Sequence, residues 1–135
     1  MRQHIIIVGG GRVGRHVAEQ LGEEQYTVTI IEKDPRKCEQ LPPGVGEVIE
    51  GDGTDPEVFE RAGPSEADVV AALTNDTDVN LAICEMAHEL APEVRTILRI
   101  SRDGEHAYGY RSFVDDIVYP AAAGATAAVD RINRI

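Results

Sequence analysis

The sequence predicts an α/β fold with three layers, in which helices cover both faces of a doubly wound, six-stranded parallel sheet. Short runs rich in β-branched residues alternate along the chain with segments whose apolar residues repeat at helical spacing. This alternation is typical of strand–helix–strand units, which place successive strands parallel to one another. The length of 135 residues corresponds to one domain, and a hydrophobic content of 42% is sufficient for a buried core.

The first predicted elements follow one another closely. Residues 4–8, "HIIIV", predict a strand, and a helix begins near Arg12. The apolar stripe of this helix repeats every four residues: Val13, Val17 and Leu21. Residues 27–31 predict the second strand, and Pro35 suits the first turn of a short helix that runs to about Leu41.

The remaining elements keep the same alternation. Residues 45–49 predict the third strand, and the next helix ends at Gly63 with either Thr54 or Asp55 as its N-cap. Further strands are expected at 67–73, 94–100 and 117–119. Further helices are expected at 79–90, at 103–113 and, rich in alanine, from 120 to the C-terminus. No repeat, linker or second domain is indicated, so residues 1–135 are predicted to form a single domain.

The composition argues against several classes of function. A net charge of −11 disfavours binding to nucleic acid, because affinity for phosphates comes mainly from Lys and Arg. Only two lysines, Lys33 and Lys37, accompany eleven arginines against 24 acidic residues, which fits either an ordinary acidic protein or adaptation to high salt. No apolar run reaches the ~20 residues of a membrane helix, and the N-terminus lacks a signal peptide, so we expect a cytoplasmic protein.

The cysteines do not predict a metal centre. Cys38 and Cys84 lie far apart in the sequence, and a cytoplasmic setting disfavours a disulfide between them. Cys84 and His88 have the i, i+4 spacing that could share a metal on a helix, but no second pair completes such a site. A buried cysteine beside a partly exposed histidine is the favoured interpretation, and no metal is expected.

Three glycines follow the first predicted strand and open the first helix. Gly9, Gly11 and Gly14 form G-x-G-x-x-G, which in this context predicts the dinucleotide-binding turn of a Rossmann fold. The free amides of the helix N-terminus would face the phosphates of a ligand, and Arg12 inside the motif could add a charged contact. The alternative is a glycine turn with a structural role only.

Glu32 ends the second predicted strand, 18 residues after Gly14. A carboxylate at this position can accept hydrogen bonds from both ribose hydroxyls of an adenosine. Its charge would repel a 2′-phosphate and so favour NAD over NADP, although Lys33 could partly neutralise such a phosphate. The alternative is a solvated charge at the end of a strand.

Further polar residues follow the third, fourth and fifth strands, where ligands of open α/β sheets bind. They are Asp52 and Thr54 in "GDGT", then Thr74, Asn75, Asp76, Asp78 and Asn80 in "TNDTDVN", and Arg99. Asp52 could meet the adenine edge or fix its own loop. For Asp76 and Asp78, capping of the following helix is as good an explanation as ligand contact. Arg99 could meet phosphates or pair with Asp76.

Catalytic sets are not recognisable in the sequence. No Tyr is followed four residues later by Lys, and none of Ser65, Ser101 and Ser112 lies in a nucleophile elbow. One domain also leaves no chain for a separate substrate domain. We therefore expect a binding module and not an enzyme; the alternative is a small NAD-dependent oxidoreductase or a fragment of one.

Several motifs occur together and in order: "VGGGRVG", "IIEKDP", "EGDGTDPEVFERAG", "ADVVAALTNDTDVNLAIC", "RTILRI" and "FVDDIVYP". From about residue 3 to residue 130, this series resembles the N-terminal nucleotide-binding domain of the TrkA family, also called the RCK or KTN domain. Members of that family are cytoplasmic regulators of potassium channels and potassium uptake systems. The resemblance implies binding of NAD(H), or of ATP, ADP or AMP, that changes conformation without transforming the ligand.

The resemblance also implies roles for individual residues. Gly9, Gly11, Arg12, Val13 and Gly14 would cradle the phosphates, Glu32 would hold the ribose, Asp52 and Thr54 would lie by the adenine, and Thr74 and Asn75 by the phosphate and distal half. It further implies a homodimer or a larger ring beneath a membrane-embedded potassium transporter or channel. Neither the glycines nor Glu32 separates NAD(H) from ATP or ADP.

The C-terminus departs from the family pattern. Many relatives continue into a second, ligand-binding domain, which is absent from a chain that ends at "DRINRI"; the chain is either an excised domain or a short natural form. The last helix has many small residues and adds apolar surface at Ile132 and Ile135. It could therefore pair with a partner copy or pack on its own sheet.

Overall fold

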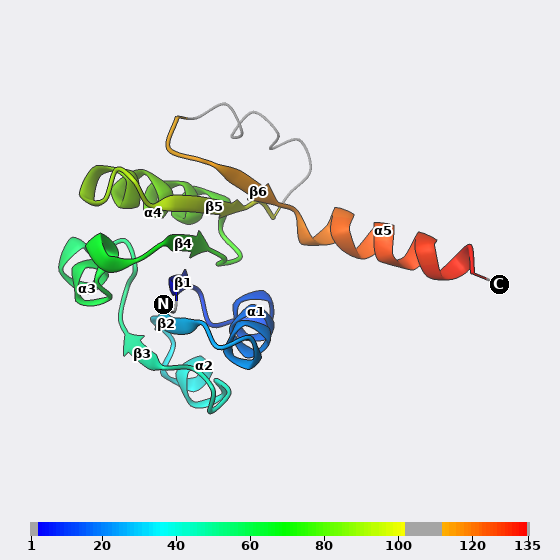
Figure 1. Ribbon diagram of the computed structural model, residues 1–135, viewed down its shortest axis with the longest axis horizontal. Helices are drawn as coiled ribbons and strands as arrows, with labels where there is room; N and C mark the ends of the chain where they lie inside the picture. Colours follow the sequence, from blue (N-terminus) through cyan, green and yellow to red (C-terminus); the bar gives the residue numbers. More distant parts are fainter. Residues whose placement is uncertain (1–2, 102–111, 135) are drawn as a thin grey trace.

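Six parallel strands form one sheet at the centre of the molecule, in the order β3-β2-β1-β4-β5-β6 (Figure 1). The structure is a computed structural model and describes residues 3–101 and 112–134. The strands are β1 His4–Val8, β2 Thr27–Glu32, β3 Glu47–Glu50, β4 Val69–Ala72, β5 Arg95–Arg99 and β6 Asp116–Val118. The chain first builds outward on one side of β1 and then crosses to the other side, so the predicted doubly wound parallel sheet is confirmed.

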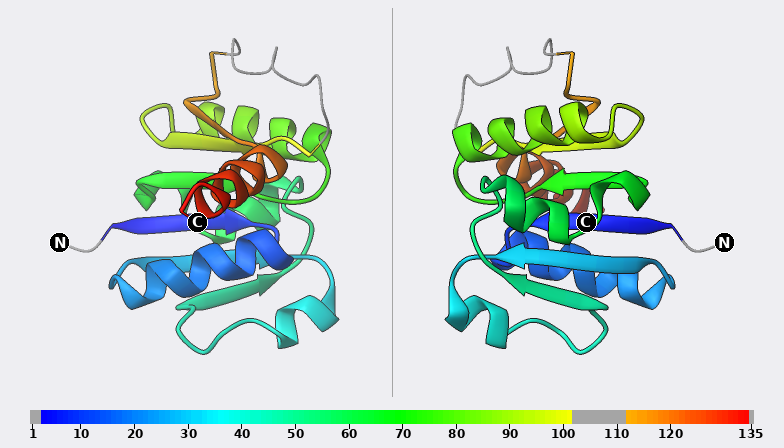
Figure 2. Two further views of the ribbon diagram at one scale, coloured as in Figure 1. Left: turned by 90° about the vertical axis from the view of Figure 1, so that its right-hand side faces the viewer. Right: turned by 90° about the vertical axis from the view of Figure 1, so that its left-hand side faces the viewer.

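Helices cover both faces of the sheet, which gives the predicted three layers. They are α1 Arg12–Glu23, α2 Pro35–Glu39, α3 Pro56–Arg61, α4 Thr77–Leu90 and α5 Pro120–Ile132, with a short 3₁₀ turn η1 at Pro64–Glu66. The two views of Figure 2 show α1 in front of one face and α3 with α4 in front of the other. This arrangement follows from right-handed crossovers, which move to the opposite face when the strand order reverses.

The core consists of two apolar clusters, one on each face of the sheet. Ile5 and Ile7 of β1 belong to the cluster beneath α1, whereas Ile6 and Val8 belong to the cluster beneath α3 and α4. Successive side chains of a strand point to opposite faces, so a continuous run of β-branched residues fills both layers at once. Phe59 of α3 is completely buried in the second cluster.

Element boundaries differ from the predicted ones by a few residues. The strand expected at 67–73 is β4 at Val69–Ala72, because the chain before it forms the turn η1. The helix expected from residue 79 begins at Thr77, and Asp55, not Thr54, caps α3. Most of the helix expected at 103–113 lies outside the described residues; Ser112 and Phe113 form a turn.

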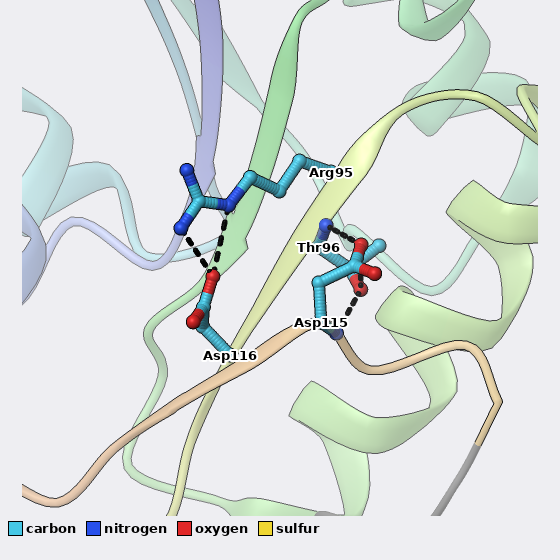
Figure 3. Close-up of polar contacts among 4 residues, drawn as sticks. All are labelled: Arg95, Thr96, Asp115 and Asp116. Carbon is cyan, nitrogen blue, oxygen red and sulfur yellow. Dashed lines mark hydrogen bonds and ion pairs between the residues drawn. The ribbon is translucent and has the colours of Figure 1, made fainter.

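The edge strand β6 and the residues just before it are fixed to the beginning of β5 by contacts of Arg95 and Thr96; Figure 3 shows those with Asp115 and Asp116. The hydroxyl of Thr96 donates to the carbonyl oxygen of Phe113 at 2.6 Å, and the amide of Thr96 donates to the carboxylate of Asp115 at 2.8 Å. Arg95 donates through Nε to the carboxylate of Asp116 at 2.8 Å. These contacts hold the chain in place where it enters β6.

The last helix, α5, projects away from the sheet on the side that carries α1 (Figure 1). None of its residues is buried, and Val129 and Ile132 are 52% and 64% exposed. The expectation that this helix could pack on its own sheet is therefore wrong. Among the helices that the structure describes, none is long and apolar enough to cross a membrane.

Candidate functional site

A cavity of about 680 Å³ opens at the carboxyl ends of the strands. Its wall passes from Val8 at the end of β1 to Glu32 of β2 and Arg99 of β5. Eleven of the twelve site residues expected from the sequence line it: Gly9, Gly11, Arg12, Val13, Glu32, Lys33, Asp52, Thr54, Thr74, Asn75 and Arg99. Only Gly14 lies outside this lining. The residues that sequence reasoning selected separately thus surround one space.

The turn between β1 and α1 can form only with glycine at two positions. Gly9 has a φ of +109°, and a Cβ there would lie 2.9 Å from the backbone nitrogen of Thr74. A Cβ on Gly14 would lie 1.8 Å from the carbonyl oxygen of Gly9, so Gly14 lets the helix start directly beneath the turn. Around Gly11, by contrast, no described atom lies within 4 Å of such a Cβ, because this residue faces the open cavity.

The N-terminus of α1 points its backbone amides at this space. Gly11 is its N-cap, no side chain caps it, and its first turn has no acidic residue. The first amides of a helix have no partner within the helix and carry a partial positive charge. An anion in the cavity would satisfy these donors.

Glu32 is buried, with 7% of its surface exposed. Its Oε1 accepts a hydrogen bond from the amide of Gly10 at 2.7 Å, and its Oε2 accepts one from the amide of Asp34 at 2.7 Å. The interpretation of Glu32 as a solvated charge is therefore wrong. The carboxylate joins the glycine turn to the end of β2, and each oxygen retains a second lone pair for a ligand.

The loop after β3 holds Asp52 in a fixed position at the cavity. Its Oδ1 accepts hydrogen bonds from the amide and the hydroxyl of Thr54, at 2.9 and 2.7 Å. These two bonds hold the pKa of Asp52 below its ordinary value, and the bond from the Thr54 hydroxyl has the larger effect. A Cβ on Gly53 would lie 2.5 Å from Val8, so the loop packs against β1 only with glycine there.

The far wall of the cavity is built by the residues after β4 and at the end of β5. Asp76 caps α4 by accepting from the amides of Asp78 and Val79 at 3.0 and 3.2 Å, which confirms the capping interpretation for Asp76. Arg99 donates to the carbonyl oxygen of Leu73 at 3.2 Å, while its Nε is buried without a partner. Burial lowers the pKa of Arg99 from its ordinary value.

Positive charge is concentrated at this cavity, although the chain as a whole carries a net charge of −11. Five basic side chains line it: Arg12, Arg15, Lys33, Lys37 and Arg99. Within residues 3–101 and 112–134 the one ion pair is Arg95–Asp116, so none of these five has a carboxylate partner there, and Arg99 does not pair with Asp76. Unpaired cations at a helix N-terminus suit a ligand with several negative charges.

The wall also contains residues that sequence reasoning missed, among them Gly10, Arg15, Lys37 and Gln40. Arg15 donates to the amide oxygen of Gln40 at 3.4 Å, which brings α1 and the end of α2 together. The fact that both lysines of the chain follow closely on Glu32 was a usable signal for Lys37. Gly10 had no signal, because its importance comes from its bond to Glu32.

Neither cysteine lines the cavity. Cys84 is completely buried, and burial raises the pKa of its thiol to about 12, so it stays protonated and is a poor metal ligand. Among the residues that the structure describes, no group of three or more His, Cys, Asp or Glu side chains could hold a metal ion.

The sequence matches the family model of the TrkA-N domain over residues 5–120. It is 40% identical over 123 residues to a Trk system potassium uptake protein TrkA homolog of Pyrococcus abyssi, an alignment that covers 87% of this chain and 54% of that protein. It is 35% identical over 105 residues to the Trk system potassium uptake protein TrkA of Halomonas elongata, covering 77% and 22%. The chain thus spans about half the length of the archaeal relative and 22% of the length of the bacterial one.

Solved structures share the fold. The TrkA-N domain of the inner membrane protein ybaL from Escherichia coli superposes with a TM-score of 0.84 at 22% identity, with 96% of each chain covered. The Kef C-terminal domain of Shewanella denitrificans in an AMP-bound form gives 0.80 at 24%, covering 91% of this chain and 75% of that one. The GsuK channel bound to NAD gives 0.73 at 18%, covering 87% and 21%.

Proposed function

This chain belongs to the TrkA-N domain family, and from that premise we propose that it is a nucleotide-binding regulatory domain of a potassium uptake system or channel. Residues 1–135 act in this proposal as one Rossmann-type domain. The relatives that the chain matches are potassium uptake proteins, and the cavity provides a place for an anionic regulator. The bound nucleotide is sensed and not transformed.

One observation carries the proposal: the uncapped N-terminus of α1 opens into a cavity lined by unpaired basic side chains and by two held carboxylates. Phosphates would lie at the amides of Arg12 and Val13, beside Gly11, which faces the open cavity. Glu32, with lone pairs left on both oxygens, would accept from the ribose hydroxyls. Asp52 would lie by the adenine.

The ligand is NAD(H) in this proposal, with ATP, ADP or AMP as alternatives. Structures of the same fold contain NAD, ADP or AMP, and these ligands share an adenosine 5′-phosphate. The cavity continues beyond the α1 N-terminus to Thr74, Asn75 and Arg99, which leaves room for a second half of a dinucleotide. Arg99 offers that half a buried donor that has no other partner.

A thermal-shift comparison of NAD, NADH, NADPH, ATP, ADP and AMP tests the proposal. A ligand that binds only the folded state stabilises it by about 2.7 kcal/mol at a hundredfold excess over its dissociation constant. We expect the largest shift with NADH or NAD, and calorimetry supplies the affinities. No binding of any of these nucleotides at millimolar concentration would overturn the proposal, and consumption of NADH with a small carbonyl compound would replace it with an oxidoreductase.

We further propose that a second copy of the chain pairs through α5, and that the assembly acts at the cytoplasmic face of a membrane-embedded potassium transporter or channel. Val129 and Ile132 of α5 are exposed. On the α1 side of β4–β6, where no described helix lies, Val69 and Ile97 are half-buried and Val118 is 37% exposed. A partner's α5 would cover that apolar face, and the nucleotide would favour one dimer geometry over another.

A further inference from the structure

Asn80, in the first turn of α4, is completely buried and has all its hydrogen-bonding groups engaged. Its Oδ1 accepts from the amide of Thr74 at 3.0 Å and from the Thr74 hydroxyl at 2.6 Å. Its Nδ2 donates to the carbonyl oxygen of Thr74 at 2.9 Å and to that of Arg99 at 3.0 Å. One side chain thus joins Thr74, two residues after the end of β4, to Arg99, the last residue of β5.

Both residues that Asn80 holds lie in the wall of the cavity, although Asn80 itself does not. The backbone of Thr74 is fixed on both its amide and its carbonyl side, and its hydroxyl is turned inward. The Nδ2 of Asn80 also fixes the main chain of Arg99, and so sets the position from which the Arg99 side chain extends. Buried polar networks of this kind specify one arrangement when every member is satisfied.

The adenosine side of the cavity is held by other contacts. The glycine turn is fixed by the amide of Gly9, which donates to Ile31 at 2.9 Å, and by the amide of Gly10, which donates to Glu32. The carboxylate of Asp52 accepts from Thr54, and its carbonyl oxygen accepts from the amide of Asp55. None of these hydrogen bonds involves Asn80, so the two halves of the site are held by separate hydrogen bonds, although Gly9 packs closely on the backbone of Thr74.

We infer that Asn80 is a positioning residue for the distal half of the nucleotide site. It would hold Thr74 and Arg99 in place to contact the part of the ligand that lies beyond the first phosphate. That part is the second nucleoside of a dinucleotide or the second phosphate of ADP. The inference rests on the proposed function. It predicts that ligands that extend beyond the first phosphate depend on Asn80, whereas AMP does not.

The test compares NADH, ADP and AMP by calorimetry on the full chain and on Asn80→Asp. This variant keeps the acceptor for Thr74 but places a carboxylate oxygen against two carbonyl oxygens, so the tie to Arg99 is broken. We expect affinity for NADH and ADP to fall at least about tenfold, as for one lost charged hydrogen bond, and affinity for AMP to stay within about threefold. If Asn80→Asp does not fold, Asn80→Ser is used for the same comparison.

Thr96→Val is the matched control. Thr96 is another buried polar side chain, but it lies near the opposite end of β5 and joins it to Phe113 and Asp115. This variant should lower the melting temperature and leave the ratio of NADH to AMP affinity unchanged. Equal losses for AMP and NADH in Asn80→Asp, or the same change of ratio in Thr96→Val, would overturn the inference while the proposed function stands. Absence of binding to the unaltered chain would overturn both.

Discussion

Substitution of Glu32 by Gln should destabilise the protein even when no nucleotide is present. The two carboxylate oxygens accept the amides of Gly10 and Asp34, each at 2.7 Å, in a side chain that is 7% exposed. Glutamine keeps one acceptor oxygen and turns an NH₂ group toward the other amide. One buried amide then loses its acceptor, and the negative charge that strengthened both bonds is gone.

The size of the effect follows from these contacts. A hydrogen bond to a charged group contributes about 1.5–3 kcal/mol, and a buried donor left without a partner costs about 1–3 kcal/mol. We therefore expect the free energy of unfolding to fall by about 2 kcal/mol. For a domain of 135 residues, the average entropy of unfolding per residue converts this loss to a fall in melting temperature of roughly 7 °C.

Urea unfolding followed by circular dichroism, without nucleotide, measures this loss. Asp52→Asn is the control, because Asp52 lies at the same cavity but is exposed, and its single accepting oxygen survives the change. The control should lose less than about 0.5 kcal/mol, since exposed groups exchange their partners for water. A loss of unfolding free energy below about 0.5 kcal/mol in Glu32→Gln would refute the claim that Glu32 stabilises the glycine turn against β2.

Three further predictions concern other parts of the molecule. Gly14→Ala should lower the free energy of unfolding in urea by about 3 kcal/mol, because its Cβ would lie 1.8 Å from a carbonyl oxygen. Gly11→Ala, whose Cβ would meet open space, should lower it by no more than about 1 kcal/mol and should weaken nucleotide binding in calorimetry. Equal losses of stability in the two variants would contradict this geometry. The pKa of Asp52 is lower in the folded state, so the stability that its ionised carboxylate contributes is complete above the unfolded pKa of 3.8 and is lost as pH falls through the folded pKa. Asp52→Asn should therefore flatten the acid side of the curve of unfolding free energy against pH. An unchanged curve would argue against this role of Asp52. Val129→Asp combined with Ile132→Asp should give a monomer by light scattering at concentrations where the unaltered chain is a dimer, with the same circular dichroism spectrum; a dimer that persists would exclude α5 as the interface.

The sequence predicts the sheet and most of the cavity wall because both depend on local signals. Runs of β-branched residues mark the strands, and parallel strands of known order bring the residues after their carboxyl ends to one edge. Glu32, Asp52 and Thr74 are therefore placed correctly without any knowledge of contacts. The capping role of Asp76 follows from the same kind of signal, since Asp is a strong N-cap residue.

Contacts between distant segments could not be predicted in the same way. The bond from Gly10 to Glu32 joins positions 22 residues apart and exists only when the turn packs against β2. The sequence places Asn80 among the polar residues at the ligand-binding edge, yet it is completely buried and lies outside the cavity lining. The direction of α5 has no local signal either, because its small residues suit packing against a sheet as well as projection into solvent.

The bonds that Glu32 makes also bear on how fast a ligand can be captured. Because both bonds are made between residues of the chain itself and need no ligand, the turn between β1 and α1 is ordered before a nucleotide arrives. The conformational entropy of that turn is lost during folding and not during association, and preorganisation of this kind raises affinity by removing a cost of binding. For the proposed nucleotide, the association rate would then be set by diffusion and by the local field of the basic side chains, and not by a slow rearrangement of the loop.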